Sequence, residues 1–184
     1  MTSKRLAVVA LVGTLAVVAA RVAAPSAHPL HVSRLLICGS QRWVQKTLQD
    51  RPRTISVKPT TIAHLVGLSR PKPAPVARSQ FERHIYSITA AVTFMNQEGD
   101  QDLHVGVQDA AGNHMLVEAP NAPFCTANAT SFRKKQMATA RSRVQLCSRA
   151  HITGVVFWDR PRIVIGRAPN AIELHPILGF DCLD

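Results

Sequence analysis

The chain has 184 residues, and 22 Lys and Arg against 11 Asp and Glu give a formal net charge of +11. This charge favours anionic partners such as wall polymers, lipid head groups or extracellular nucleic acid, or serves only solubility. The sequence has no Walker A loop and no dinucleotide fingerprint, which excludes ATP- and NAD-dependent chemistry, and only 5% of its residues are aromatic, which disfavours base or sugar stacking.

The N-terminal segment has the pattern of a signal peptide. Lys4 and Arg5 precede an uncharged apolar run from Leu6 to Ala20, and small residues follow. We therefore predict a signal peptide over residues 1–27, cleaved near residues 20–27, and a mature protein that is secreted or lies in the cell envelope. The run is shorter than the roughly 20 apolar residues of a membrane span. An uncleaved anchor is the alternative, and no transmembrane span is expected in the mature chain.

Residues 28–80 are predicted to form an N-terminal arm. Residues 34–57 are polar and basic, without a clear period. Thr60 is a plausible N-cap for a short helix that carries Ile62, Leu65 and Val66 at helical spacing and ends near Gly67. Residues 69–78 hold three prolines in close succession, which predicts a stiff, extended connector.

The pattern changes to a period of two in residues 81–184. Alternating apolar residues predict strands over 86–94, 103–107, 115–118, 151–158 and 171–178, and residues 129–146, which lack Gly and Pro, predict a helix. Three strands, a helix and two more strands is the order of an OB-type barrel. We predict a mainly β protein with one or two helices, built as an OB-like five-stranded barrel with an N-terminal arm.

The chain contains four cysteines, at positions 38, 125, 147 and 182. An even number in an exported chain predicts two disulfides. Of the three pairings, we expect Cys125–Cys147, which would clip the ends of the helix, and Cys38–Cys182, which would tie the ends of the domain. No pair has the C-x-x-C spacing of a zinc site, and oxidised cysteines would not serve thiol catalysis.

Polar residues with catalytic potential interrupt the apolar strands. His104 and Glu118 are expected on facing positions of adjacent strands, and Glu173 and His175 share one face because they are two residues apart. A strand histidine is more often structural, but a polar pair within an apolar strand needs partners if it is buried. The candidate catalytic residues are His104, Glu118, Glu173, His175 and Asp159, and the candidate metal ligands are Asp102, His104, Glu173 and His175.

Several of these motifs resemble those of a family of small exported bacterial proteins. The resemblance covers about residues 50–180 and rests on Asp102-Leu-His104, Glu118-Ala-Pro120 and Asn170-Ala-Ile-Glu173-Leu-His175-Pro176. The family's activity is unknown, so the resemblance implies relatedness and export but no reaction. Family members often carry His-Gly-Gln in the loop after the fourth strand, where this chain has Arg162-Ile-Val164.

The chain also has a faint likeness to staphylococcal-nuclease-like OB barrels. Glu98-Gly99-Asp100 falls in the turn before the second strand, and Glu118 follows in the third. However, Gln101 replaces the expected threonine, and Met115-Leu-Val117 lacks the expected arginine, so groups that would orient a phosphate are missing.

Two main functions and one simpler alternative follow from these residues. We expect a non-enzymatic extracytoplasmic binding domain for an anionic polymer or partner, with the contacts made by basic residues of the helix (Lys134, Lys135, Arg141 and Arg143). The alternative is a metal-dependent, nuclease-like hydrolase that uses the His/Glu cluster, and a divalent metal is the one cofactor that these residues could hold. A structural envelope protein is the third alternative. The hydrolase needs its candidate side chains in one cleft that is open to solvent, and scattered or core-packed positions would rule it out. The binding domain needs its basic residues on one face.

Overall fold

A computed structural model describes residues 38–39, 41–53, 56–122 and 124–184. The predicted signal peptide, residues 1–27, lies outside the described residues. No helix in the described part of the chain is long and apolar enough to cross a membrane. The elements in chain order are α1 (Trp43–Lys46), β1 (Val57–Pro59), α2 (Ile62–Gly67), β2 (Ile85–Gln97), β3 (Leu103–Gln108), β4 (His114–Ala119), α3 (Ser131–Arg143), β5 (Ala150–Trp158) and β6 (Ile172–Cys182).

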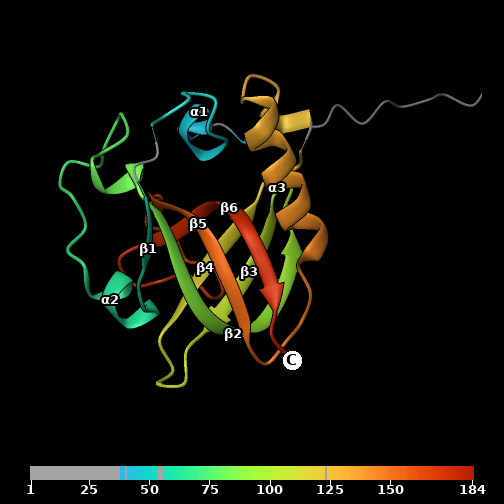
Figure 1. Ribbon diagram of the computed structural model, residues 1–184. Helices are drawn as coiled ribbons and strands as arrows, with labels where there is room; N and C mark the ends of the chain where they lie inside the picture. Colours follow the sequence, from blue (N-terminus) through green and yellow to red (C-terminus); the bar gives the residue numbers. More distant parts are fainter. Residues whose placement is uncertain (1–37, 40, 54–55, 123) are drawn as a thin grey trace, which may run out of the picture. The chain divides into compact units, whose positions relative to one another are not determined.

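The five long strands close into a barrel (Figure 1). They are hydrogen-bonded in the order β2-β3-β4-β6-β5, and β5 pairs with β2 to complete the ring. All of these pairings are antiparallel except β4 with β6, while the short β1 adds a parallel strand to β2. This strand order, with α3 between β4 and β5, confirms the predicted OB-like barrel.

The alternating pattern of β2 produces the expected two-faced strand. Tyr86, Ile88, Ala90 and Val92 are buried in the core, and the residues between them are more exposed. A register shift follows Val92, beyond which Phe94 lies across β3 at Gly106. A Cβ at Gly106 would lie 2.1 Å from the Phe94 ring, so the glycine leaves the space that this ring occupies.

Both predicted helices form, with small changes at their ends. Thr61, not Thr60, is the N-cap of α2, because its side chain accepts a hydrogen bond from the His64 amide. The Thr60 amide instead donates to the Ser87 carbonyl and extends the pairing of β1 with β2. The helix α3 begins after Thr130, whose hydroxyl accepts from the Arg133 amide, and it packs on β6 and β4.

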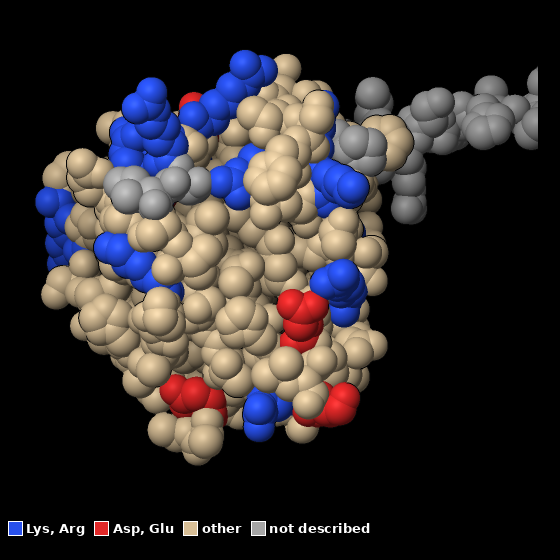
Figure 2. Space-filling model, viewed as in Figure 1, with Lys and Arg blue, Asp and Glu red and all other residues tan. Residues whose placement is uncertain are grey.

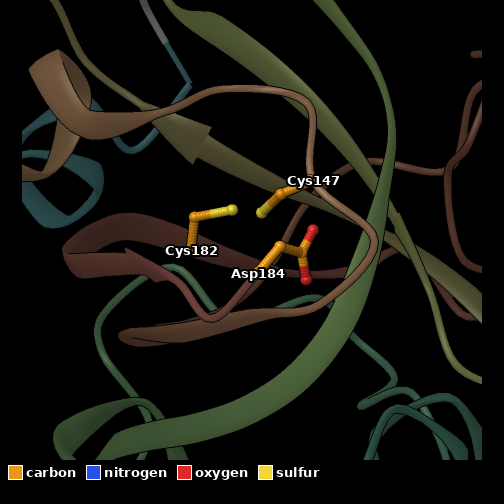
Figure 3. Close-up of side chains that lie close together, drawn as sticks. All are labelled: Cys147, Cys182 and Asp184. Carbon is orange, nitrogen blue, oxygen red and sulfur yellow. The ribbon is translucent and has the colours of Figure 1, made fainter.

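The predicted disulfide pairing is wrong. The structure contains one disulfide, Cys38–Cys125, rather than Cys125–Cys147 and Cys38–Cys182. The 13 residues of α3 separate Cys125 from Cys147 along about 20 Å of helix, too far for one bridge. The β5–β6 pairing instead sets Ala150 opposite Cys182, which brings Cys147 and Cys182 together as free thiols beside Asp184 (Figure 3).

Candidate functional site

A cluster of buried ionisable side chains lies at the end of the barrel that α1 covers, on the strand faces opposite the apolar core. It contains all six residues that the sequence nominated for catalysis or metal binding, and each is at most 3% exposed. These residues come from the start of β3 and from β4, from the residue after β5, and from β6: Asp102, His104, Glu118, Asp159, Glu173 and His175. Below, this set is called the barrel-end cluster.

The strand register explains why these side chains meet. His104 and Glu118 are direct partners in the β3–β4 pair, with His104 Nε2 3.1 Å from Glu118 Oε1. The parallel β4–β6 pair aligns Leu116 with Glu173 and Val117 with Leu174, so the next position brings Glu118 beside His175. Three neighbouring strands therefore present polar side chains to one point, on the faces that alternate with the core residues Val105, Val117 and Leu174.

His175 stands at the centre of the barrel-end cluster. Its Nδ1 lies 2.7 Å from Glu118 Oε2 and 3.3 Å from Glu173 Oε1, and its Nε2 lies 3.3 Å from Asp102 Oδ2. Burial and the Lys46 charge each lower the pKa of His175, but Glu118 and Glu173 outweigh them and raise it to about 9. Burial also raises the pKa of Asp102, to about 7, against the lowering effect of His175.

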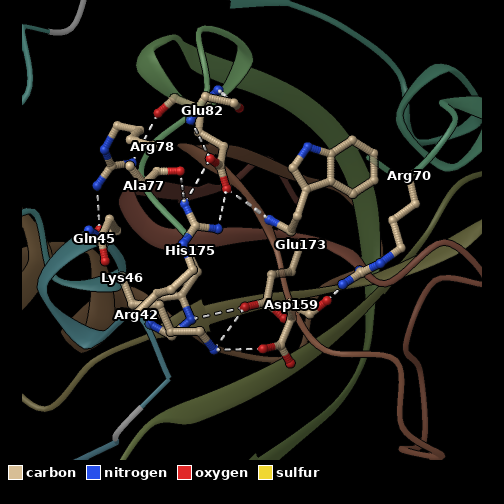
Figure 4. A network of polar contacts seen from close by, with 12 residues as sticks. Arg42, Gln45, Lys46, Arg70, Ala77, Arg78, Glu82, Asp159, Glu173 and His175 are labelled. Atoms are coloured by element: carbon tan, nitrogen blue, oxygen red, sulfur yellow. Dashed lines mark hydrogen bonds and ion pairs between the residues drawn. The ribbon is translucent and has the colours of Figure 1, made fainter. Parts of the chain in front are cut away.

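Two cations that the sequence did not single out neutralise the cluster. Lys46, at the end of α1, places its Nζ 3.1 Å from Glu173 and 3.5 Å from Asp159 (Figure 4). The same Nζ lies 3.6 Å from Glu118. Burial lowers the pKa of Lys46, but these three carboxylates raise it above its usual value. Arg167 Nη1 lies 2.5 Å from Asp159 Oδ2 and 3.7 Å from Glu173 Oε2. No local pattern marks either cation, because both lie in irregular or very short segments.

Contacts of α1 hold Lys46 in place. The neighbouring Arg42 guanidinium donates to both oxygens of Glu82 at 2.8 and 2.9 Å, and Glu82 also accepts from the Trp158 amide of β5. The Trp43 indole donates to the Cys125 carbonyl at 3.0 Å, next to the Cys38–Cys125 disulfide. The arm is thereby fixed to the barrel on two sides.

A pocket of about 250 Å³ opens beside Lys46 and Asp159. Its rim includes two exposed arginines, Arg160 and Arg162, from the loop after β5. The remaining lining residues are Gly39, Gln41, Trp43 and Asp100. The pocket reaches the edge of the barrel-end cluster, while Glu118 and His175 stay fully buried beneath it.

The four basic residues of α3 do not present a set of free charges. Arg143 pairs with Asp181 at 2.8 Å, and Arg141 donates to the Ala119 carbonyl. The Lys134 ammonium donates to the Ala127 carbonyl at 3.3 Å, and Lys135 is exposed. On the face in Figure 2, most Lys and Arg lie in the upper half, where α1 and α3 lie, and most of the visible acids lie lower.

The fold and the cluster define a class: an OB-like barrel with a buried acid–histidine cluster at one end. No protein-family model matches the chain, and no curated protein matches it significantly. Solved structures show weak likeness at 10–12% identity. An aspartyl-tRNA synthetase assigned in Leishmania major Friedlin has a TM-score of 0.41 over 72% of this chain and 24% of that chain. Asparaginyl-tRNA synthetase of Entamoeba histolytica has a TM-score of 0.37 over 69% of this chain and 24% of that chain. This chain thus spans about a quarter of each, and scores this low carry no argument about function.

Proposed function

We propose that the protein is an extracytoplasmic binding domain and that it takes a phosphate group of an anionic ligand into the pocket at the α1 end of the barrel. The observation that carries this proposal is the pocket rim, where Arg160 and Arg162 are exposed beside the Lys46 ammonium. Arginine forks match the geometry of phosphate oxygens. Phosphate is also the chemistry shared by lipid head groups, nucleic acids and many wall polymers.

The charges around the pocket support an anion more than a cation. Asp159 is already contacted by Lys46 and Arg167, and Arg162 of the rim lies 3.7 Å from it, so the charge of Asp159 is balanced within the protein. Asp100 is the one remaining acid of the lining, against the two rim arginines. The net charge of the chain adds long-range attraction for polyanions. The volume suits one charged group of a larger ligand rather than a whole drug-sized molecule.

Binding of inorganic phosphate and of polyphosphate, measured by calorimetry at low salt, tests the proposal. Arg160→Ala/Arg162→Ala is expected to weaken polyphosphate binding about tenfold or more, since each charged hydrogen bond contributes about 1.5–3 kcal/mol. Lys135→Ala, an exposed lysine of α3 outside this pocket, is the matched control and should bind as wild type. Equal binding by the double variant, or an equal loss in the control, would show that the charge acts without this pocket.

A metal-dependent hydrolase is the second candidate function. The convergence of His104, Glu118 and His175 favours it, because Glu118 lies 3.1 Å from His104 and 2.7 Å from His175. The burial of all three side chains, which removes them from direct contact with solvent, is against it. Wild type would then cleave a chromogenic phosphodiester only with added divalent cation, and Glu118→Gln would lose this activity. Absence of cleavage with Zn²⁺, Mn²⁺ and Mg²⁺ would remove this candidate and leave the binding function.

A further inference from the structure

We infer that Asp102, Glu118 and His175 form a binding site for one divalent transition-metal ion within the barrel-end cluster. Each of the three residues offers a ligand atom, and these atoms lie within 4.8 Å of one another. The inference goes beyond the proposed anion binding, because the ion would lie below the pocket, among side chains that the pocket does not expose.

Two of the three residues are positioned by paired strands. Glu118 lies in β4 and His175 in the neighbouring β6, while Asp102 is the residue directly before β3. Sites built on strands hold their ligands more precisely than sites on loops. The strand pairing therefore preorganises Glu118 and His175.

The hydrogen-bonding state of these groups points to a cation. Neither oxygen of Asp102 has an aligned hydrogen bond with the described residues, and the same is true of His175 Nε2. The Glu118 oxygens also lack an aligned hydrogen bond, but they are in ion contact with His104 and His175. Buried carboxylate oxygens are normally satisfied, and leaving one without a partner costs free energy. Asp102 Oδ2 lies 3.3 Å from His175 Nε2, close enough for both atoms to bind the same ion.

A charge count leads to the same conclusion. The cluster holds four buried carboxylates, Asp102, Glu118, Asp159 and Glu173. The permanent cations among them are Lys46 and Arg167. Four negative and two positive charges leave two negative charges when the histidines are neutral, which is the form that binds metals. One divalent cation restores balance in an interior where uncompensated charge is costly.

The ligand set indicates which ions fit. Two carboxylates and one imidazole suit Zn²⁺ or Mn²⁺, whereas Ca²⁺ prefers six to eight oxygens. Nδ1 of His175 lies 2.7 Å from Glu118 Oε2 and 3.3 Å from Glu173 Oε1, so with Nε2 and Glu118 as ligands Glu173 is the carboxylate left to orient the metal-binding histidine. The Lys46 ammonium contacts Glu173 most closely, at 3.1 Å, so it lies toward Glu173 and Asp159 rather than at Asp102.

Titration of the chelator-treated, oxidised protein with Zn²⁺, Mn²⁺ and Co²⁺ tests the inference. Wild type is expected to bind one equivalent and to show a higher thermal midpoint with metal. Asp102→Asn keeps the shape of the side chain and should weaken binding at least tenfold. Asp181→Asn is the control and should bind metal like wild type. It removes an exposed carboxylate of β6 that forms an ion pair with Arg143.

A second cluster, Cys147, Cys182 and Asp184, could also take a metal, and the experiment separates the two sites. Co²⁺ in the barrel-end cluster has only oxygen and nitrogen ligands, so its spectrum should show no thiolate charge-transfer band. The spectrum of Cys147→Ser/Cys182→Ser should be the same. A thiolate band that disappears in this double variant, no binding of any of the three ions, or undiminished binding by a folded Asp102→Asn protein would each overturn the inference. Phosphate binding at Arg160 and Arg162 is measured separately, so failure of one proposal leaves the other standing.

Discussion

Lys46 carries much of the electrostatic balance of the barrel-end cluster. Its ammonium contacts three carboxylates from β4, β6 and the residue after β5. A buried ion pair adds little net stability compared with an apolar pair, but removal of one partner leaves an uncompensated charge. Substitutions at this position therefore report how strongly the cluster depends on its internal cation.

We expect Lys46→Met to lower the free energy of unfolding by about 3–5 kcal/mol, because Glu173, Asp159 and Glu118 lose their shared cation. Urea denaturation of metal-free protein measures this. Lys135→Met on the exposed face of α3 should change stability by less than about 0.5 kcal/mol. If the divalent site exists, saturating Zn²⁺ should recover part of the loss at Lys46. A Lys46→Met protein as stable as wild type would mean that the carboxylates take up protons instead.

At the scale of elements, α1 is a short helix with little stability of its own. Four residues cannot sustain a helix alone, so its position depends on the Arg42–Glu82 pair, the Trp43 contact with Cys125 and the Cys38–Cys125 disulfide. These contacts keep Lys46 directed at the carboxylates of Glu173 and Asp159 (Figure 4). The cover of the site is thus fixed from outside the helix.

Cys38→Ser/Cys125→Ser is expected to cost about 2–4 kcal/mol of stability, since it removes a link between residues 87 apart. Loosening of α1 should also shift the Trp43 fluorescence to longer wavelength, whereas Trp158 is buried in the core and should not respond. Cys147→Ser/Cys182→Ser serves as the control for loss of sulfur. Unchanged emission together with unchanged stability would indicate that the polar contacts hold α1 without the disulfide.

The end of β6 offers a second cysteine pair. The Cys147 and Cys182 sulfurs lie within 4.8 Å of each other, and both side chains are partly exposed. In a glutathione redox buffer we expect them to give two electrons and two protons to glutathione disulfide and to form a second bridge. Peptide mapping without reduction detects a Cys147–Cys182 peptide. Recovery of both as free thiols, while Cys38–Cys125 is oxidised, would contradict this expectation.

For the whole molecule, the buried groups predict an unusual dependence of stability on pH. The pKa of His175 is raised to about 9, so this group binds its proton more tightly in the folded than in the unfolded chain. Its contribution is complete below about pH 6.5 and is lost as the pH rises through about 9. Asp102 acts in the same direction, because its raised pKa of about 7 means that stability is lost as the pH rises from about 4 to 7. On the acid side, burial raises the pKa of Glu82, but the hydrogen bond from Arg42 outweighs burial and lowers it. The contribution of Glu82 to stability is therefore lost as the pH falls below about 4.5.

We therefore expect the metal-free protein to be most stable at mildly acidic pH and to lose about 3 kcal/mol from His175 alone between about pH 6.5 and 9. Thermal midpoints across this range measure the effect. His175→Gln should flatten the alkaline side, and His114→Gln, an exposed histidine at the start of β4, should keep the wild-type curve. A wild-type midpoint that is constant from pH 6.5 to 9 would refute a proton held on His175 in the folded state.

The sequence by itself determined the strands, the helices and the OB-like order, because alternation over neighbouring residues decides which face of a strand is buried. The sequence also predicted His104, Glu118, Glu173 and His175 as candidate site residues, because polar residues in apolar strands need partners when they are buried. Only the tertiary structure decided the Cys38–Cys125 pairing and the entry of Lys46 and Arg167 into the cluster. These contacts join segments that are far apart in the chain and have irregular backbone. Such segments have no hydrophobic periodicity from which the buried side chains could be predicted.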